Sequence, residues 1–170
     1  VDRDGIDEGR QRLEASFAAL GARRLDLVQL HNLRGAATLL PMLREEKAAG
    51  RIGHIGITSS SASQYAEMEA IMHRESLDFI QVDYAVGNRG AEERLLPLAA
   101  DRGMAVLVNL PFGRGAQFRA VGSRPLPAWA AEIDCDSWAQ VFLKFVLGNT
   151  AVTCAIPGST QPAHVEDNLG

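Results

Sequence analysis

The sequence predicts an α/β fold, namely a (β/α)8 TIM barrel that is present here as an incomplete barrel of about five β-α units. Short runs of continuous apolar residues, typical of strands covered on both faces, alternate with segments of helical periodicity. The runs begin at Asp26, His54, Phe79, Ala105 and Val152, at intervals of 28, 25, 26 and 47 residues. The first three intervals are close to one-eighth of the ~250 residues of such a barrel.

Strands that alternate with helices pair in parallel through right-handed crossovers. The expected strands are residues 26–31, 54–58, 79–84, 105–110 and 152–157. A doubly wound sheet shows the same alternation, but it normally has a Gly-rich phosphate loop after its first strand. The sequence contains neither GxGxxG nor GxxxxGK[ST], which favours the barrel. Because five strands cannot close an eight-stranded barrel, we interpret them as strands four to eight.

Helical signals precede the first strand and fill the spaces between strands. The expected helices are residues 5–20, 38–49, 61–74, 92–102 and 136–147. The first is amphipathic through Leu13, Phe17 and Leu20, and the last opens with Asp136 as its N-cap. Pro97 must either kink its helix or mark a restart. Residues 112–133, rich in Gly, Arg and Pro, are expected to form a long loop over the active face of the barrel.

Composition sets the broad class. The chain has 170 residues, of which 46% are hydrophobic and 22% charged, so we expect residues 1–170 to form one domain. It carries 17 Lys and Arg against 21 Asp and Glu, a net charge of −4 that predicts no attraction for nucleic acid. No apolar run reaches the ~18–20 residues of a membrane helix. Cys135 and Cys154 have neither CxxC nor zinc spacing, so we expect apolar fillers and no metal site.

The ends of the sequence suggest that it belongs to a longer protein. It starts at Val1 without Met and stops at Gly170, within an expected helix start. Residues 1–12 are charged and lack the apolar core of a secretory signal, so we expect a cytoplasmic location.

Polar residues gather where the chemistry of a barrel lies, at the carboxyl ends of the strands. This ring contains one imidazole, several hydroxyls, two amides and one carboxylate, but no evident pair of nucleophile and base. Its members include His31, Thr58, Ser59, Gln81, Asp83 and Asn109. The segment 157–160 precedes Pro162 and a helix start, so its free N–H groups favour an anion. These residues alone predict a barrel enzyme with a phosphate-bearing cofactor or substrate.

Five segments, in order, resemble the aldo-keto reductase family. They are LDLVQLHN at 25–32, GRIGHIGITS at 50–59, FIQVDY at 79–84, SWAQVFLK at 137–144 and IPGSTQPAHVEDN at 156–168. The resemblance implies a (β/α)8 barrel that moves a hydride between NADP(H) and an aldehyde or ketone, a small-molecule carbonyl substrate. The family's catalytic group is Asp, Tyr, Lys and His. His31 matches the His, which orients and polarises the carbonyl, whereas the other three belong to barrel strands that this chain does not contain.

The resemblance also implies a set of cofactor-binding residues. Thr58, Ser59 and Gln81 match the positions that bind the nicotinamide carboxamide. Asn109 stands where many members have an aromatic ring that stacks on the nicotinamide. The positions implied for the rest of the dinucleotide are Phe112 and Arg114 over the pyrophosphate, Ser159, Thr160 and His164 at the 2′-phosphate, and Asp167 and Asn168 at adenine.

Two departures bear on the choice of cofactor. Gly158 replaces a common Lys and His164 replaces a common Arg, which removes two cations from the site of a dianionic phosphate. We expect NADP(H) because hydroxyls and N–H groups remain, with NAD(H) as the alternative.

Simpler interpretations stand beside these. His31 can be a core histidine, residues 58–61 also form a good N-cap run, and Tyr84 is expected to make a structural hydroxyl bond. One rival function is a non-catalytic subunit that binds or senses a nicotinamide nucleotide on the same barrel. Another is a different phosphate-binding barrel, such as an isomerase. The sequence leaves the oligomeric state open.

Overall fold

The computed structural model describes residues 4–170, so the first three residues of the charged segment 1–12 lie outside the description. Five parallel strands form one sheet in the order β1-β2-β3-β4-β5. The strands are β1 (Leu25–His31), β2 (Ile52–Ser59), β3 (Phe79–Asp83), β4 (Ala105–Asn109) and β5 (Cys154–Ala155). Each expected strand is present, although β5 is much shorter than the apolar run 152–157 suggested.

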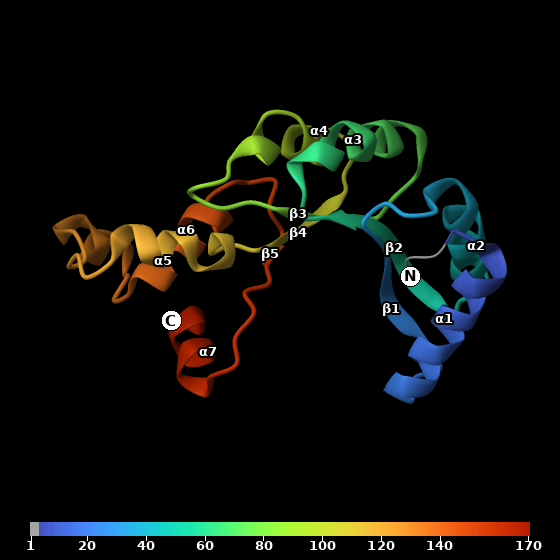
Figure 1. The fold of residues 1–170 in the computed structure, drawn as a ribbon, viewed down its shortest axis with the longest axis horizontal. Coiled ribbons are helices and arrows are strands. Elements are labelled where there is room, and N and C mark those ends of the chain that lie inside the picture. Colours follow the sequence, from blue (N-terminus) through green and yellow to red (C-terminus); the bar gives the residue numbers. More distant parts are fainter. Residues whose placement is uncertain (1–3) are drawn as a thin grey trace.

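Helices cover the outer side of the sheet in an arc, with α1 and α2 beside β1 and β2, and α3 and α4 beside β3 and β4 (Figure 1). The helices are α1 (Ile6–Leu20), α2 (Ala36–Ala48), α3 (Tyr65–Arg74), α4 (Leu95–Asp101), α5 (Ala116–Val121), α6 (Trp138–Leu147) and α7 (Pro162–Leu169). Helix α7 packs against α6, and the carboxyl end of the chain lies there. Among residues 4–170, no helix is both long enough and apolar enough to cross a membrane.

Side chains alternate between the two faces of the sheet, as strand geometry requires. Val28 and Leu30 of β1 face the helices and are buried. The helix-facing residues join one continuous core with the apolar faces of α1 to α4. On the inner face, the register places His31 beside Thr58, Thr58 beside Gln81, and Gln81 beside Leu107. Residues that share a row across the sheet point to the same side, so His31, Thr58 and Gln81 line the inner face.

Gly56 allows strands β2 and β3 to approach closely on that inner face. A Cβ atom at this position would lie 2.5 Å from the carbonyl oxygen of Phe79 and 2.9 Å from its Cβ. Both distances are shorter than van der Waals contact, so only glycine fits here without separating the strands.

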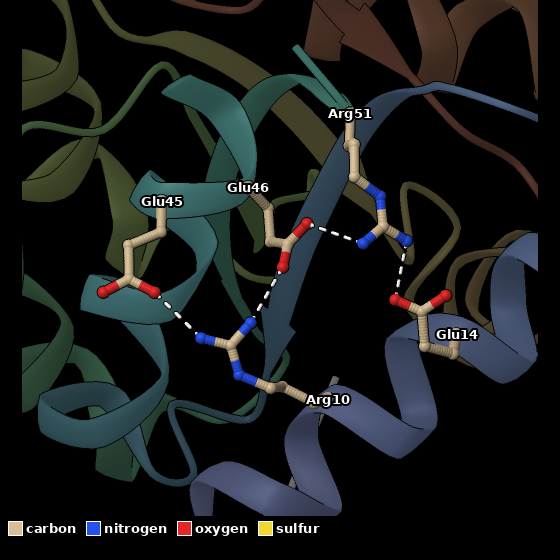
Figure 2. A network of polar contacts seen from close by, with 5 residues as sticks. All are labelled: Arg10, Glu14, Glu45, Glu46 and Arg51. Carbon is tan, nitrogen blue, oxygen red and sulfur yellow. Dashed lines mark hydrogen bonds and ion pairs between the residues drawn. The ribbon is translucent and has the colours of Figure 1, made fainter. Parts of the chain in front are cut away.

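A network of ion pairs joins α1, α2 and the start of β2 (Figure 2). Glu46 is buried, accepts a hydrogen bond from Arg10 at 2.9 Å and forms an ion pair with Arg51 at 3.1 Å. Arg10 also bonds Glu45 at 2.8 Å, and Arg51 bonds Glu14 at 2.6 Å. Both Glu46 contacts are charge-assisted and satisfy a carboxylate that would otherwise be costly to bury.

Several local expectations are corrected or confirmed. The N-cap of α6 is Ser137, whose Oγ accepts from Gln140 N at 3.1 Å, so the expected Asp136 cap was wrong by one residue. Pro97 marks a restart: a 3-10 turn ends before it, and α4 begins at Leu95. Leu20, the last residue of α1, is 69% exposed rather than buried. Cys135 is a buried filler, but Cys154 is exposed on the inner face.

The expected long loop 112–133 contains its own helices. It folds as a 3-10 turn, the short helix α5 and a second 3-10 helix at Ala128–Ile133. A small second core holds this segment against α6. We call residues 112–133 the lobe. The lobe follows β4 and packs against α6, so it lies beside the carboxyl ends of β4 and β5.

Candidate functional site

Three predicted residues stand in one row at the carboxyl ends of neighbouring strands. His31 ends β1, Thr58 is the penultimate residue of β2, and Gln81 lies in β3. His31 is exposed, Gln81 is partly exposed and Thr58 is buried. The row offers an imidazole, a hydroxyl and an amide on one face, a set that binds neutral polar groups such as a carboxamide or a carbonyl.

Ser59 occupies a different place from that row. It alternates to the helix-facing side, where its Oγ donates to Gln64 Oε1 at 2.7 Å and accepts from Ser61 N at 3.2 Å. Gln64 in turn donates from Nε2 to the Asn32 carbonyl at 3.0 Å. Ser59 therefore fixes the turn after β2 and, through Gln64, the segment that follows His31.

Asp83, at the end of β3, belongs to a polar cluster that the sequence did not reveal. Its Oδ1 accepts from the Tyr65 hydroxyl at 2.9 Å, and its Oδ2 accepts from Asn88 Nδ2 at 2.6 Å. Burial and the hydrogen bond to the Asp83 carboxylate raise the pKa of Tyr65 well above its usual value. Tyr65 therefore stays protonated at neutral pH and holds Asp83 in place rather than donating a proton.

Tyr84 has the structural role that was expected. Its hydroxyl donates to Glu92, and burial together with this carboxylate raises the pKa of Tyr84 to about 12. The Arg89 guanidinium beside Glu92, together with that hydroxyl, lowers the pKa of the Glu92 carboxyl. The Tyr84 phenol is thus poorly suited to give up its proton.

Asn109 ends β4 next to Asp83 in the register. Its Oδ1 atom is buried and accepts no hydrogen bond from any residue in the described part of the chain. A buried amide oxygen in this condition has lost its water without gaining a partner. Within the described residues, Asn109 thus brings to the predicted nicotinamide set a buried acceptor that is unmet.

Five of the predicted residues meet around a cavity of about 350 Å³ between α6, α7 and the segment after β4. They are Phe112, Ser159, His164, Asp167 and Asn168. Gly158 also lines this cavity, and none of the described residues that line it is Lys or Arg. The volume is in the usual range for small-molecule sites. Its lining combines an aromatic wall with a few polar groups, as sites for planar bases do.

The aromatic wall comes from a cluster of rings that bridges the lobe and α6. Phe112 and Phe118 lie 5.0 Å apart, Phe118 and Phe142 5.5 Å, and Trp138 and Phe142 5.7 Å between ring centroids. The Trp138 indole is fixed because its Nε1 donates to the Arg124 carbonyl at 3.0 Å. Neither Phe118 nor Trp138 was predicted as a site residue, because helical spacing cannot distinguish a core ring from a cavity wall.

The remaining predicted residues lie in neighbouring depressions. Thr160 lines a shallow, open depression with Ser159 and Gln161. Arg114 lines a separate cavity of about 270 Å³, together with Asp83 and Asn88. Apart from Ser59, the structure thus divides the predicted cofactor residues among the inner face of the sheet, the 350 Å³ cavity and these two depressions.

The chemistry of the assembled site is that of binding. His31 is the one predicted catalytic residue, and neither Tyr65 nor Tyr84 is set up as an acid. Within residues 4–170, no group of three or more His, Cys, Asp or Glu side chains is placed to hold a metal ion.

Comparison with known proteins identifies what this arrangement is similar to. Residues 5–170 match the family model described as the Aldo/keto reductase family. The chain is 30% identical over 191 residues to the NADH-specific methylglyoxal reductase of Escherichia coli, covering 94% of this chain and 58% of the relative. It is 29% identical over 158 residues to methylglyoxal reductase YeaE of the same organism, covering 91% and 55%.

Solved structures agree on the fold. An aldo-keto reductase from Klebsiella pneumoniae in complex with NADPH superposes with a TM-score of 0.79 at 23% identity, over 97% of this chain and 59% of that one. The aldo-keto reductase AKR11C1 from Bacillus halodurans gives a TM-score of 0.73 at 22% identity, over 95% and 59%. The predicted incomplete (β/α)8 barrel is therefore confirmed, and the chain spans between 51 and 58% of the length of its sequence relatives.

Proposed function

Because this chain belongs to the aldo/keto reductase family, we propose that residues 1–170 form one domain, the C-terminal part of an oxidoreductase that transfers a hydride between NADP(H) and an aldehyde or ketone. The observation that carries the proposal is the cavity between α6 and α7, where five residues implied by the resemblance meet. The His31, Thr58 and Gln81 row supports it from the strand ends.

The residues present fit a nicotinamide dinucleotide. Aromatic rings and the Asn168 amide suit adenine, since an aromatic face stacks on a base and an amide matches its hydrogen-bonding edge. The Asn109 acceptor and the Gln81 amide suit a carboxamide. Bound there, the cofactor supplies the hydride.

The chain's own contribution is binding and orientation. Thr58 and Gln81, neighbours on the inner face of the sheet, would hold the carboxamide through a hydroxyl and an amide. His31, at the end of the same row, donates a hydrogen bond to the carbonyl oxygen of the substrate and polarises it. The family's Asp, Tyr and Lys have no counterparts in this chain, so we assign no proton donor to it.

Membership of the family does not decide between NADP(H) and NAD(H) as the cofactor. Gly158 and His164 leave the 2′-phosphate region without a permanent cation, whereas Ser159, Thr160 and the helix start retain donors. One relative is described as NADH-specific and one structural neighbour holds NADPH. We propose NADP(H) as the cofactor with NAD(H) as its competitor, in a cytoplasmic protein whose partner is a small carbonyl compound rather than nucleic acid or membrane.

The second candidate is a subunit that binds or senses the nucleotide without catalysis. It is favoured by the same observation that favours binding chemistry: His31 is the only predicted catalytic residue in the row. In this case nucleotide binding would persist without turnover.

Two measurements on the purified protein test these proposals. Titration with NADPH and NADH, followed by quenching of the nucleotide fluorescence, tests binding. Oxidation of NADPH with a panel of aldehydes and ketones, in wild type and His31→Ala, tests catalysis. Binding with turnover that His31→Ala lowers at least tenfold supports the reductase. Binding without turnover selects the sensing subunit, and absence of binding refutes both.

A further inference from the structure

Two consecutive side chains at the start of α3 reach the ends of three neighbouring strands. Gln64 donates from Nε2 to the Asn32 carbonyl, just after β1, at 3.0 Å. Its Oε1 accepts from the hydroxyl of Ser59, the last residue of β2, at 2.7 Å. The hydroxyl of Tyr65 donates to the carboxylate of Asp83, at the end of β3, at 2.9 Å. One short segment therefore ties together the strand ends that form the candidate site.

The direction of the Gln64 amide is fixed by its partners. Ser59 is only 1% exposed, and its Oγ accepts from Ser61 N at 3.2 Å, so the hydroxyl hydrogen is available for Gln64 Oε1. A backbone carbonyl only accepts hydrogen bonds, so Asn32 requires the NH₂ end of the amide. Exchanging the two ends of this amide would break both bonds.

The segment that Gln64 holds has an unfavourable backbone conformation. Asn32 and Leu33 have φ values of 53° and 59°, in the left-handed region that residues other than glycine rarely adopt. Two such residues in succession persist only where their surroundings fix them. Leu33 is fixed by its side chain, which is buried in the core, and Asn32 by the bond from Gln64 to its carbonyl.

His31 depends on this segment because it is the last residue of β1 and Asn32 follows it directly. In the sheet that residues 4–170 form, β1 pairs with β2 alone, and His31 stands beside Thr58 in that pair. A change in the backbone of Asn32 would therefore alter the direction in which the imidazole leaves the strand.

We propose that Gln64 is a positioning residue that sets the direction of His31 toward the carbonyl of the substrate. This role rests on the proposed function, in which His31 donates a hydrogen bond to that carbonyl. The family resemblance did not supply Gln64 as a site residue. Its amide bonds Ser59 on the helix-facing side of the sheet, so Gln64 acts through His31 rather than on the substrate.

Two variants of Gln64 in the purified protein test this role. Gln64→Glu has the same shape and keeps an acceptor for Ser59 Oγ, but it places a carboxylate oxygen against the Asn32 carbonyl. Gln64→Met has a similar length and no charge, so it loses both bonds without adding an electrostatic effect. Tyr65→Phe is the matched control, because it removes the hydrogen bond of the adjacent residue to β3 and leaves the bond to Asn32 intact.

The first measurement does not depend on hydride transfer. The chain has four histidines, and the imidazole signal that disappears from the NMR spectrum of His31→Ala is that of His31. Both Gln64 variants should shift this signal and leave that of His54, near the other end of β2, in place. Tyr65→Phe should leave the His31 signal unchanged.

The second measurement is turnover with NADPH and an aldehyde that the wild type reduces. In both Gln64 variants kcat should fall at least tenfold, because small errors in the placement of a catalytic group are costly. The affinity for NADPH, measured by fluorescence titration, should stay within twofold of the wild type. A merely structural role of Gln64 would lower the midpoint of thermal unfolding without separating kcat from affinity in this way.

The outcomes distinguish this inference from the proposed function. Absence of turnover in the wild type refutes the proposed function, and a His31 signal that still moves in the Gln64 variants then supports the positioning role by itself. The inference is overturned if the His31 signal stays in place, if Tyr65→Phe moves it equally, or if both Gln64 variants of an active protein retain the wild-type kcat. If one Gln64 variant does not fold, the other decides by the same criteria.

Discussion

Gln140 holds Asp167 through two hydrogen bonds, from its Nε2 to the backbone carbonyl at 3.0 Å and to Oδ1 at 3.2 Å. Ser137 Oγ donates to the other carboxylate oxygen, Oδ2, at 2.8 Å. Helix α7 is thereby fixed to the first turn of α6. These bonds also position Asn168, the neighbour of Asp167; both residues line the cavity, and their place at adenine stays a prediction.

Ser137→Ala should therefore weaken both the fold and nucleotide binding. The substitution removes the N-cap acceptor of α6 and the donor to Asp167, and loss of such a cap costs about 1–2 kcal/mol. We expect a lower midpoint of chemical unfolding and a weaker NADPH affinity. Ser123→Ala, at an exposed position in the lobe, is the control and should change stability by less than about 0.5 kcal/mol. Equal behaviour of the two variants would contradict the proposed link between α6 and α7.

Trp138 should report nucleotide binding by its fluorescence. It lines the 350 Å³ cavity, whereas the only other tryptophan of the chain, Trp129, lies in the lobe and is 48% exposed. Adenosine monophosphate, which has no nicotinamide, should quench wild type and Trp129→Phe but not Trp138→Phe. Loss of the larger aromatic face should also weaken binding about threefold to tenfold, the value of one aromatic contact. Quenching that survives in Trp138→Phe would place the base elsewhere.

His164→Arg should shift the choice of nucleotide toward NADPH. His164 lines the cavity in which we propose that the 2′-phosphate and adenine bind, and no permanent cation lines it. A guanidinium supplies charge-assisted hydrogen bonds to a phosphate at every physiological pH. We expect the ratio of NADPH to NADH affinity to rise about tenfold or more, measured by fluorescence titration. His164→Gln, which has no charge, should leave that ratio low. An unchanged ratio in His164→Arg would show that the 2′-phosphate does not lie near this residue.

Glu46→Gln should destabilise the protein by about 1–2 kcal/mol, because it weakens a charge-assisted hydrogen bond from Arg10 and removes an ion pair with Arg51 at a buried carboxylate. The neighbouring Glu45→Gln is a matched control: the Glu45 side chain is 67% exposed and its one ion pair lies in solvent. Exposed ion pairs are worth about 0–1 kcal/mol, so little change is expected. Urea unfolding of both variants measures the difference. Similar effects from Glu45 and Glu46 would mean that burial of the network does not matter.

Asp78 should make stability depend on pH in the acid range. Burial alone would raise the pKa of this carboxyl, but hydrogen bonds from Lys47 and from Ile55 N at 2.8 Å, with the Lys47 charge, lower it below its ordinary value. Its folded pKa is therefore lower than its unfolded pKa. The resulting stabilisation is present above the unfolded value of 3.8 and is lost as the pH falls through the folded value.

Asp78→Asn tests this expectation, since an asparagine oxygen can still accept from Ile55 N. At pH 7 the variant should be less stable than wild type by up to about 1 kcal/mol, the size of a partly exposed ion pair. The difference should shrink as the pH is lowered below 3.8. A difference that stays constant down to pH 2 would assign the effect to geometry rather than charge.

The sequence predicted the sheet well because its information is local. Apolar runs mark each strand, and the row of His31, Thr58 and Gln81 follows once parallel neighbours are assumed. Contacts between distant segments were harder to foresee. The hydroxyl that binds Asp83 belongs to Tyr65, eighteen residues earlier on another element, and nothing in the spacing of the two residues indicates it.

The lobe after β4 is the second part of the structure that the sequence did not predict in detail. A segment rich in Gly and Pro predicts a loop, and a loop prediction does not indicate where any side chain points. Gln117 and Phe118 therefore escaped notice, although Gln117 lines the 270 Å³ cavity and Phe118 lines the 350 Å³ cavity. The N-cap of α6 was misplaced by one residue, because Asp136 and Ser137 are both good caps and only the backbone geometry distinguishes them.

The order of the strands has a consequence for how the chain acquires its structure. Each strand pairs with the one just before it, so the sheet can grow in the order of synthesis. Each step then closes only the short connection between two consecutive strands. The last step differs, because the lobe separates β5 from β4 and only Leu107 with Cys154 and Val108 with Ala155 are in register. We expect β5 and α7 to join last and to open first, which makes the adenine side of the proposed nucleotide site the latest part of the molecule to mature.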